Sequence, residues 1–549
     1  MSRPERLVRA ASEFIDLVAV PFTLPGSRLL VRRAVGGGLS VCRAEYEVDA
    51  DDAVAIPALQ VLDGAGTPLP VTGVAVDRID FGDGAASLTF GTPSELSVGG
   101  PAVAAIRLAP DAPAIPLDGS DALLVVAADR GVRVVRDHAH AERLARTAGL
   151  WRNWFTGCPR VRQDLEATAA HCWWVLGANQ VTLDLVPGSR AVVPSKLGYV
   201  ALWQWDAYFI AIGLRHGDLA LAEEQLELAL GNAHADGQLP DVVHDTGVLA
   251  SSQDLPPADL ARLRELGSPA ADPAAPVPLT KPPLAALALT RLAESGASRE
   301  WLARMLPTVQ HAQEWWFDRC FAADGLPEYG HPYSSGLDDS PVFDADLPVA
   351  TPDLAAYLEL QDLLLADLLA AQEDEVAAVG HRTRAAATRP ALLRMWDSGR
   401  LRFTPRGSHG PVTAHTVVDL LPLLTGTLPA TVIGSLADDI VTPTTFATPY
   451  PVPTVARDDP SFDPERMWRG PVWVNTNWLL VEGLERSGRE GAARTLAERT
   501  LAMVVEARGA FEYYQPLTGG RAPRAAPAFA WTAALFLDLA VRFAPAEGA

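Results

Sequence analysis

The segment YVALWQWDAYFIAIGLRHGDLALAEEQLELALGNAH, residues 199–234, is typical of two helices that are joined almost without a loop. Its apolar residues recur with a helical period, and Ala, Leu, Arg and Glu dominate the whole chain after Asp137. We therefore expect one helix over residues 199–215 and a second over 217–234.

The same pattern of paired helices continues through the rest of the chain after Asp137. The further expected helices span residues 138–155, 160–177, 281–296, 299–321, 353–373, 375–398, 429–440, 472–488, 489–507 and 528–543. Twelve helices in successive pairs are what a closed ring of six helical hairpins needs. A fixed repeat of roughly 34 or 40 residues, which would indicate an open solenoid, is absent from the sequence.

Residues 1–136 have a different pattern, and all 14 Trp residues of the chain lie after them. Short apolar stretches alternate with Gly, Asp and Pro clusters, which is typical of a β-sandwich. The expected strands lie at residues 29–31, 44–48, 71–79 and 122–128, and the glycine clusters at 36–38 and 82–84 are expected turns. We therefore predict a β-rich, sandwich-like domain over 1–136 and a helical domain over 137–549.

The composition excludes several classes of partner. The 549 residues carry 45 Lys and Arg against 67 Asp and Glu, a formal charge of −22, which argues against nucleic-acid binding. The sequence contains no apolar run of the roughly 18 residues that a membrane span needs. Glu13 and Asp16 interrupt the apolar stretch near the N-terminus, so we expect a cytoplasmic protein without a secretory signal.

Metal and nucleophile chemistry find little support in the sequence. It contains no G-x-S-x-G elbow, phosphate-binding loop or H-E-x-x-H pair, and we expect His138 and His140 on the surface. The cysteines show no zinc-site spacing and are expected to be buried free thiols: Cys42, Cys158, Cys172 and Cys320. We therefore expect neither a metal nor an organic cofactor.

Three segments combine carboxylates with aromatic side chains. Residues 331–341 contain Asp338 and Asp339 among turn formers, 508–516 place Glu512 among aromatics, and 202–209 contain Trp205-Asp206. The alternatives are an Asx turn with solvated acids for the first segment and an aromatic core with a capping Asp for the third. Two distant acids beside Trp–Asp elements are nevertheless the minimum set for glycoside hydrolysis, in which one acid protonates the leaving oxygen and the other activates water.

Six motifs occur in an order that resembles a known family. They are Trp203-Gln204-Trp205-Asp206, Lys281-Pro282-Pro283, Ser335-Gly336-Leu337-Asp338-Asp339-Ser340-Pro341, Trp468-Arg469-Gly470-Pro471-Val472-Trp473, Phe511-Glu512-Tyr513-Tyr514 and Phe529-Ala530-Trp531-Thr532. Together, over roughly residues 140–545, they resemble glycoside hydrolase family 63, which includes mannosylglycerate and glucosylglycerate hydrolases and processing α-glucosidases; trehalases are more distant relatives. The resemblance implies an (α/α)6 barrel that inverts an α-glycosidic bond without a cofactor.

The resemblance also implies the site residues. Asp338 takes the role of general acid and Glu512 that of general base. The expected substrate-binding residues are Trp205, Asp206, Lys281, Tyr333, Gly336, Trp468, Arg469 and Trp531. Lys281 stands where the family usually has Gln, and a cation there favours an anionic or strongly polar leaving group; the alternative is a solvent-facing lysine.

We therefore predict a mainly α, exo-acting, inverting α-glycosidase that acts on an α-glucoside or α-mannoside of a small soluble aglycone. The competing hypotheses are a sugar epimerase or polysaccharide lyase on a helical barrel, and a non-catalytic carbohydrate-binding protein. The insertions at 251–280 and 324–352 are expected lids or binding loops. The sequence leaves the oligomeric state and the identity of the sugar open.

Overall fold

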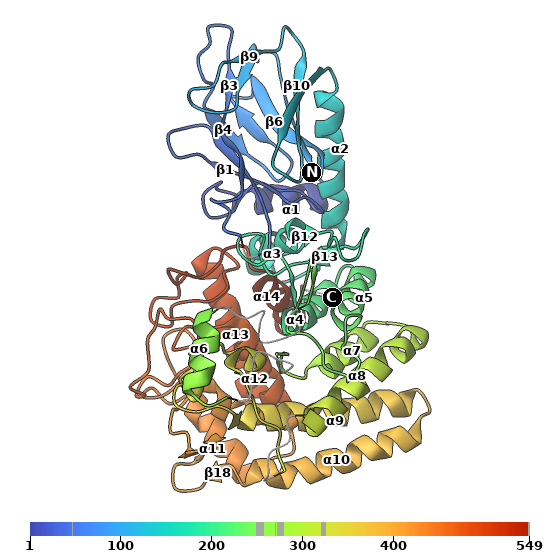
Figure 1. The fold of residues 1–549 in the computed structure, drawn as a ribbon, viewed down its shortest axis with the longest axis vertical. Coiled ribbons are helices and arrows are strands. Elements are labelled where there is room, and N and C mark those ends of the chain that lie inside the picture. The colour runs from blue at the N-terminus through green and yellow to red at the C-terminus, as the bar shows by residue number, and fades with distance from the viewer. Residues whose placement is uncertain (47, 249–256, 269–270, 272–278, 320–324, 547–549) are drawn as a thin grey trace.

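The computed structural model describes residues 1–46, 48–248, 257–268, 271, 279–319 and 325–546. It has a β-rich part, formed by the N-terminal residues, and a larger helical body below it (Figure 1). Some sequence expectations fall wholly or partly outside the described residues. The expected strand at 44–48 includes Glu47, the expected helix at 299–321 includes residues 320 and 321, and the insertion at 324–352 includes residue 324. Cys320 and much of the insertion at 251–280 also lie outside.

Two antiparallel sheets form the β-rich part. The first has the order β1 (Leu29–Arg33), β2 (Leu39–Arg43), β3 (Val54–Leu62), β8 (Ala105–Arg107), β9 (Ile115–Pro116). The second has the order β11 (Val132–Asp137), β10 (Asp121–Val126), β7 (Glu95–Gly99), β6 (Ala86–Thr92), β5 (Ile79–Phe81), β4 (Val71–Val74). Their buried side chains share one core, in which the rings of Phe22 and Phe90 are 5.3 Å apart. The β-rich N-terminal region expected from the sequence is therefore present.

The local expectations for this part are only partly met. The glycines at 36–38 form the turn between β1 and β2, and those at 82–84 the turn between β5 and β6, as expected. The expected strand at 71–79 is instead a hairpin of β4 and β5. An unexpected helix, α1 (Arg3–Ser12), precedes the sheets; a capping box between Ser2 and Glu5 satisfies the first amides of this helix.

Helix α2 (His140–Trp154) packs against β6 and β7, although the sequence pattern places it with the other helices. His140 is buried at its start, so the expectation of a surface side chain is wrong for this residue, whereas His138 is exposed. The imidazole of His140 hydrogen-bonds to Ser87 Oγ at 2.8 Å and Ser97 Oγ at 3.0 Å. These two hydroxyls satisfy both ring nitrogens, which allows the imidazole to be buried.

The helical body contains the remaining expected helices. They are α3 (Glu166–Ala178), α4 (Gln204–Leu214), α5 (Leu219–Leu230), α7 (Ala285–Glu294), α8 (Arg299–Arg319), α9 (Pro352–Ala371), α10 (Glu375–Leu393), α11 (Ala430–Ile440), α12 (Val474–Arg486), α13 (Glu490–Ala507) and α14 (Ala530–Phe543). With α2, all twelve expected helices are confirmed. A further helix, α6 (Pro257–Glu265), lies in the insertion that we expected to be a loop.

Short strands connect the helices of the body. They are β12 (Gln180–Val181), β13 (Ala191–Val192), β14 (Leu202–Trp203), β15 (Val242–His244), β16 (Gly247–Val248), β17 (Val349–Ala350), β18 (Trp396–Asp397), β19 (Arg402–Phe403), β20 (Arg406–Gly407) and β21 (Gly410–Pro411). The whole chain is thus a mixed helical and sheet protein, and "mainly α" describes only the part after residue 137.

Six segments of the body contact one another in sequence and close into a ring. Helices α4, α7 and α9, the short 3-10 segment η8 (Leu421–Thr425), α12 and α14 follow one another, and α14 returns to α4. Every residue of α4 is buried, as are nearly all of α9 and α12, so these inner helices are enclosed on all sides. Helices α5, α10 and α13 pack outside α4, α9 and α12.

One member of this ring was not expected from the sequence. The segment η8 is too short to show a helical period, because Pro422 opens it and the left-handed Gly426 ends it. The contact that closes the ring depends on Gly213 in α4. A Cβ atom added there would lie 2.4 Å from both Cα and Cβ of Ala534 in α14.

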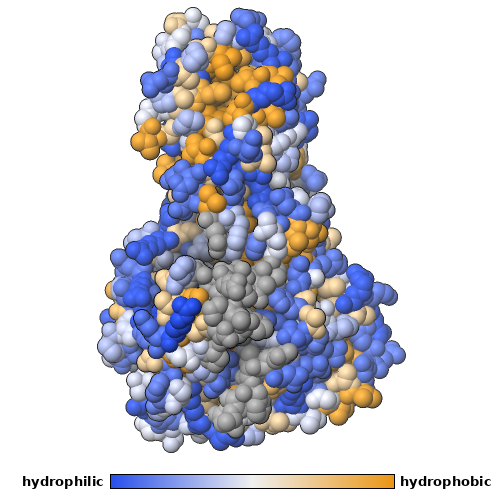
Figure 2. All heavy atoms as spheres, viewed as in Figure 1, coloured by the Kyte–Doolittle hydropathy of each residue, from blue (hydrophilic) through white to orange (hydrophobic). Residues whose placement is uncertain are grey.

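The surface and the thiols agree with the composition. Hydrophilic residues predominate over the helical body in Figure 2, and apolar residues gather on the β-rich part. The described cysteines, Cys42, Cys158 and Cys172, are buried free thiols, as expected. Among the helices that the structure describes, we find none with the length and apolarity required to span a lipid bilayer.

We expect Gly213→Ala to lower the midpoint of thermal unfolding. The added methyl group overlaps the backbone of α14, and such overpacking costs about 1–3 kcal/mol. The matched control is Gly380→Ala in α10, where the new methyl group meets open space and should stabilise the helix by about 0.5–1 kcal/mol. Equal unfolding midpoints for the two variants would contradict this account of ring closure.

Candidate active site

Eight of the ten predicted site residues line one central cavity at the mouth of the ring. They are Trp205, Asp206, Lys281, Gly336, Asp338, Trp468, Glu512 and Trp531. Several belong to the starts of inner helices, since Trp205 and Asp206 open α4 and Trp531 opens α14. The remaining lining residues are Tyr199, Trp203, Met467, Trp473 and Phe529. The ring therefore gathers residues that are up to 332 positions apart in the chain, from Tyr199 to Trp531.

Asp338 lies in the loop between the 3-10 turns η5 (Pro332–Ser335) and η6 (Pro341–Phe343). It is half-buried, and its Oδ1 has no hydrogen-bond partner. Loss of hydration raises the pKa of Asp338 to about 7, against the lowering effect of Lys281 and with the help of Asp241, Asp339 and Glu512. A carboxyl group in these surroundings keeps its proton near neutral pH.

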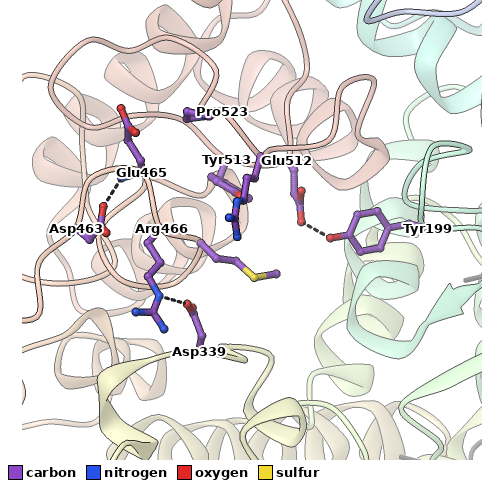
Figure 3. A pocket seen from close by; sticks show the side chains of 10 residues that line it. Tyr199, Asp339, Asp463, Glu465, Arg466, Glu512, Tyr513 and Pro523 are labelled. Atoms are coloured by element: carbon purple, nitrogen blue, oxygen red, sulfur yellow. Dashed lines mark hydrogen bonds and ion pairs between the residues drawn. The ribbon is translucent and has the colours of Figure 1, made fainter. Parts of the chain in front are cut away.

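The neighbouring Asp339 has a different task, although it lines the cavity on the side of Asp338 together with that residue. Its Oδ1 accepts a hydrogen bond from the Trp468 amide at 2.9 Å. Its Oδ2 accepts one from Arg466 Nε at 3.0 Å (Figure 3). Asp339 thus fixes the loop at 463–469 against the loop of Asp338.

Glu512 follows α13 and is 3% exposed. Its Oε1 accepts the Tyr199 hydroxyl at 2.9 Å, and its Oε2 accepts the Ala526 amide at 2.8 Å. Burial raises the pKa of Glu512 to about 7, while these two hydrogen bonds act in the opposite direction. Figure 3 shows Glu512 and Tyr199 on one side of a wider cavity and Asp339 with Arg466 on another.

Tryptophan rings form the wall of the central cavity. Trp468 and Trp473 stack at 3.6 Å, and Trp531 lies 5.4 Å from both Trp473 and Trp205. Gly336 makes room for this wall, because its φ is +73° and an added Cβ would lie 2.3 Å from the Trp205 indole. The result is a low-polarity wall beside two carboxyl groups.

Two wider cavities adjoin the central one, and Met467 lines all three. The cavity on the Glu512 side has a volume of about 640 Å³. The cavity on the Asp338 side has a volume of about 310 Å³ and is lined in part by Arg262, His331 and Tyr333. The central cavity itself holds only about 50 Å³.

The two other predicted site residues lie outside the central cavity. Tyr333 lines the cavity on the Asp338 side, and its hydroxyl donates to Asp259 Oδ2 at 2.8 Å. Arg469 forms a two-pronged ion pair with Asp344 and lines none of the three cavities. Arg469 therefore holds together the loops that follow Asp338 and Met467.

Sequence reasoning missed Tyr199, Asp241 and Met467. Tyr199 could have been found as the hydroxylated aromatic that closely precedes the Trp203-Gln204-Trp205-Asp206 motif. Asp241, whose carboxylate lies 2.9 Å from Lys281 Nζ, and Met467 carry no signal of their own, since only the fold brings them to the site. Over the described ranges, no group of three or more His, Cys, Asp or Glu side chains is arranged to hold a metal ion.

Comparison with known proteins supports the resemblance to glycoside hydrolase family 63 that the sequence motifs indicate. The family model of the mannosylglycerate hydrolase MGH1-like glycoside hydrolase domain matches residues 199–532. Mannosylglycerate hydrolase MGH1 of Selaginella moellendorffii is 28% identical over 416 residues, which cover 63% of this chain and 81% of that protein.

Two solved structures agree with the fold. The mannosylglycerate hydrolase of Thermus thermophilus, in complex with Tris and D-glycerate, has a TM-score of 0.56 and 25% identity over 67% of this chain and 98% of its own. A bacterial glucoamylase complexed with acarbose has a TM-score of 0.52 and 10% identity, and covers 96% of this chain and 94% of its own, so it shows the fold alone. The chain therefore belongs to the MGH1-like glycoside hydrolase domain family, within glycoside hydrolase family 63, and is a glycoside hydrolase.

Proposed function

We propose that the protein is an inverting, exo-acting α-glycosidase that releases glucose or mannose from a small, polar or anionic aglycone. The observation that carries the proposal is the pair of carboxyl groups, Asp338 and Glu512, that line one aromatic-walled cavity and whose pKa values are both raised to about 7. The family assignment favours hydrolysis over the epimerase, lyase and binding-protein hypotheses.

Their surroundings support different roles for the two carboxyl groups. Glu512 accepts two hydrogen bonds that stabilise its ionised form, which suits a general base. Asp338 has an oxygen without a hydrogen-bond partner and other carboxyl groups nearby, which suits a protonated general acid. Asp338 protonates the leaving oxygen while Glu512 takes a proton from water, whose oxygen attacks the anomeric carbon from the opposite face and inverts it.

The three cavities support a division of the substrate. Because the acid protonates the leaving oxygen, the aglycone belongs in the cavity on the Asp338 side, and the attacking water enters from the Glu512 side. Ligand sites usually measure about 300–1,000 Å³, so the central cavity of about 50 Å³ takes the sugar only when Met467 and its neighbours shift. The tryptophan wall beside the two carboxyl groups suits a terminal sugar and hence exo-action.

The nature of the aglycone is supported by Arg262 in α6, which lines the cavity on the Asp338 side. Its guanidinium lies 3.6 Å from Asp344, a carboxylate that is already bound by Arg469, so Arg262 has hydrogen-bonding capacity left for a carboxylate group. Mannosylglycerate, the compound after which the relatives are named, contains a carboxylate group. A sugar joined to glycerate or a similar small acid is therefore the first substrate to test.

We also propose that residues 137–549 form an (α/α)6 barrel domain and residues 1–136 a separate β-rich domain. The closed inner ring from α4 to α14, with helices packed outside it, supports the barrel. Because α2 packs against the β-rich part, it acts as the connection between the two domains.

We expect Asp338→Asn and Glu512→Gln each to lower kcat by about 10²–10⁴-fold, because each removes a proton-transfer group. Both substitutions keep the shape of the side chain and remove a carboxyl group from poorly hydrated surroundings, so the thermal unfolding midpoint should not fall. Release of glucose or mannose from sugar-glycerate compounds is the assay. Glu506→Gln, which alters a surface partner of Tyr450, is the control and should retain activity. Near-normal turnover by either site variant would refute the assignment.

A proton NMR time course on an α-glycoside should show the β-anomer of the free sugar first, because water attacks opposite the leaving group. The α-anomer appears only later, by mutarotation. Initial release of the α-anomer would instead establish retention and exclude Glu512 as a base that acts on water.

The pH–rate profile of kcat/KM should be bell-shaped with its maximum near pH 7, since activity needs Glu512 ionised and Asp338 protonated. Tyr199→Phe removes a hydrogen bond to the Glu512 carboxylate and so raises the pKa of Glu512. The acidic limb should therefore move to higher pH by about 0.5–1 unit, while the basic limb stays in place. Tyr450→Phe, remote from the cavities, serves as the control, and an unmoved acidic limb in Tyr199→Phe would contradict the role of Glu512.

A further inference from the structure

Lys281 is a buried lysine at the edge of the central cavity, 4% exposed. Its Nζ lies 2.9 Å from Asp241 Oδ1 and donates to the carbonyl oxygen of Tyr333 at 2.7 Å. The third near oxygen is Oδ1 of Asp338, at 3.8 Å. An ammonium group has three hydrogens, of which one is donated to Tyr333, and the ion pair with Asp241 holds the group in place near Asp338.

These contacts make Lys281 a poor direct anchor for a substrate. Its ammonium group is enclosed, and two protein oxygens hold it in place. Although burial acts to lower its pKa, the carboxylates of Asp241 and Asp338 raise it, so Lys281 is charged at neutral pH. A solvent-facing lysine, which the sequence left open as the alternative, differs from this buried placement.

The charges around the central cavity are unbalanced. Among the described residues that line it, Lys281 is the cation, whereas Asp206, Asp338 and Glu512 are acidic. When Asp338 loses its proton, a new negative charge forms beside other carboxyl groups in poorly hydrated surroundings. A cation at short range is the effective compensation for such a charge, because the local dielectric constant is low.

We propose that Lys281 is a positioning residue that acts through Asp338, an inference that rests on the proposed function. The ammonium group of Lys281 stabilises the carboxylate that forms when Asp338 gives up its proton. In this step the O–H bond of Asp338 breaks, the proton joins the glycosidic oxygen, and the bond from that oxygen to the anomeric carbon breaks. The oxygen of water bonds to the anomeric carbon, and Glu512 receives the proton of water.

Asp241 sets the strength of this effect. It draws Lys281 to itself, so that the ammonium group stays 3.8 Å from Asp338 instead of forming a close ion pair with it. A close pair would hold Asp338 ionised at neutral pH, and an ionised carboxylate has no proton to donate. The triad of Asp241, Lys281 and Asp338 therefore leaves Asp338 protonated before the reaction and stabilises the Asp338 carboxylate afterwards.

The titration of Asp338 depends on every charged or titratable group near it. Besides Lys281 and Asp241, those on the neighbouring loops and helices are Tyr199, Asp206, Asp259, Arg262, His331, Tyr333, Asp339, Arg466 and Glu512. Variants of Lys281 and Asp241 leave all of these in place, so opposite shifts in the two variants isolate the contribution of the triad.

The test is the pH dependence of kcat in Lys281→Met and Asp241→Asn, with an α-linked sugar-glycerate as substrate. Loss of the cation raises the pKa of Asp338, so the basic limb of Lys281→Met should move up by about one unit, and kcat should fall about 10–100-fold. Loss of the negative charge of Asp241 lowers the pKa of Asp338, so the basic limb of Asp241→Asn should move to lower pH. Lys281→Arg keeps the charge and should restore the wild-type limb in large part.

The double variant Lys281→Met/Asp241→Asn avoids leaving one buried charge unpaired, which would destabilise the fold. Its basic limb should lie between those of the wild type and Lys281→Met. Unchanged basic limbs in folded Lys281→Met and in the double variant, whatever their kcat, would overturn the proposal, since a merely structural role lowers kcat without moving the limb. If the wild-type enzyme hydrolysed no α-glycoside, the proposed function would be refuted instead. The failure of the proposed function is thus distinguishable from the failure of the role of Lys281.

Discussion

The close approach of α4 and α14 is the contact on which the site depends. Gly213 allows the two helices to meet backbone to backbone at Ala534, and this contact joins the last inner helix to the first. The starts of the same two helices carry Trp205 and Trp531, whose rings lie 5.4 Å apart in the cavity wall. A larger side chain at position 213 would separate the helices, and the wall with them.

The order of the motifs along the chain follows from this architecture. The starts of α4 and α14 carry Trp205, Asp206 and Trp531, while Lys281 and Trp473 shortly precede α7 and α12. Because these residues line one cavity, the beginnings of the inner helices meet at one end of the ring. The long loops at this end then supply the acids, Asp338 before α9 and Glu512 before α14. Asp339 connects two of the loops by holding Trp468 and Arg466.

Sequence reasoning worked where one residue type implies one environment. Apolar periodicity located twelve helices, and carboxylates among aromatics pointed to Asp338, Glu512 and Asp206. It failed where tertiary partners decide the outcome. His140 is buried because two serine hydroxyls from the β-rich part meet its ring, and η8 belongs to the inner ring although Pro422 keeps it too short for a helical pattern. Tyr199 and Asp241 matter only because the fold places them beside Glu512 and Lys281.

The sequence by itself determined the helical pairs and the β-rich N-terminal part, because periodicity is a local property. Through the order of its motifs it also identified eight of the residues that line the central cavity. Only the tertiary structure decided how these residues act on one another. The raised pKa values of Asp338 and Glu512 arise from loss of hydration inside the closed ring. The ammonium group of Lys281 lies 2.9 Å from Asp241 and 3.8 Å from Asp338, so it interacts more strongly with Asp241. Electrostatic interactions depend on separation and burial, which a linear chain does not specify until it has folded.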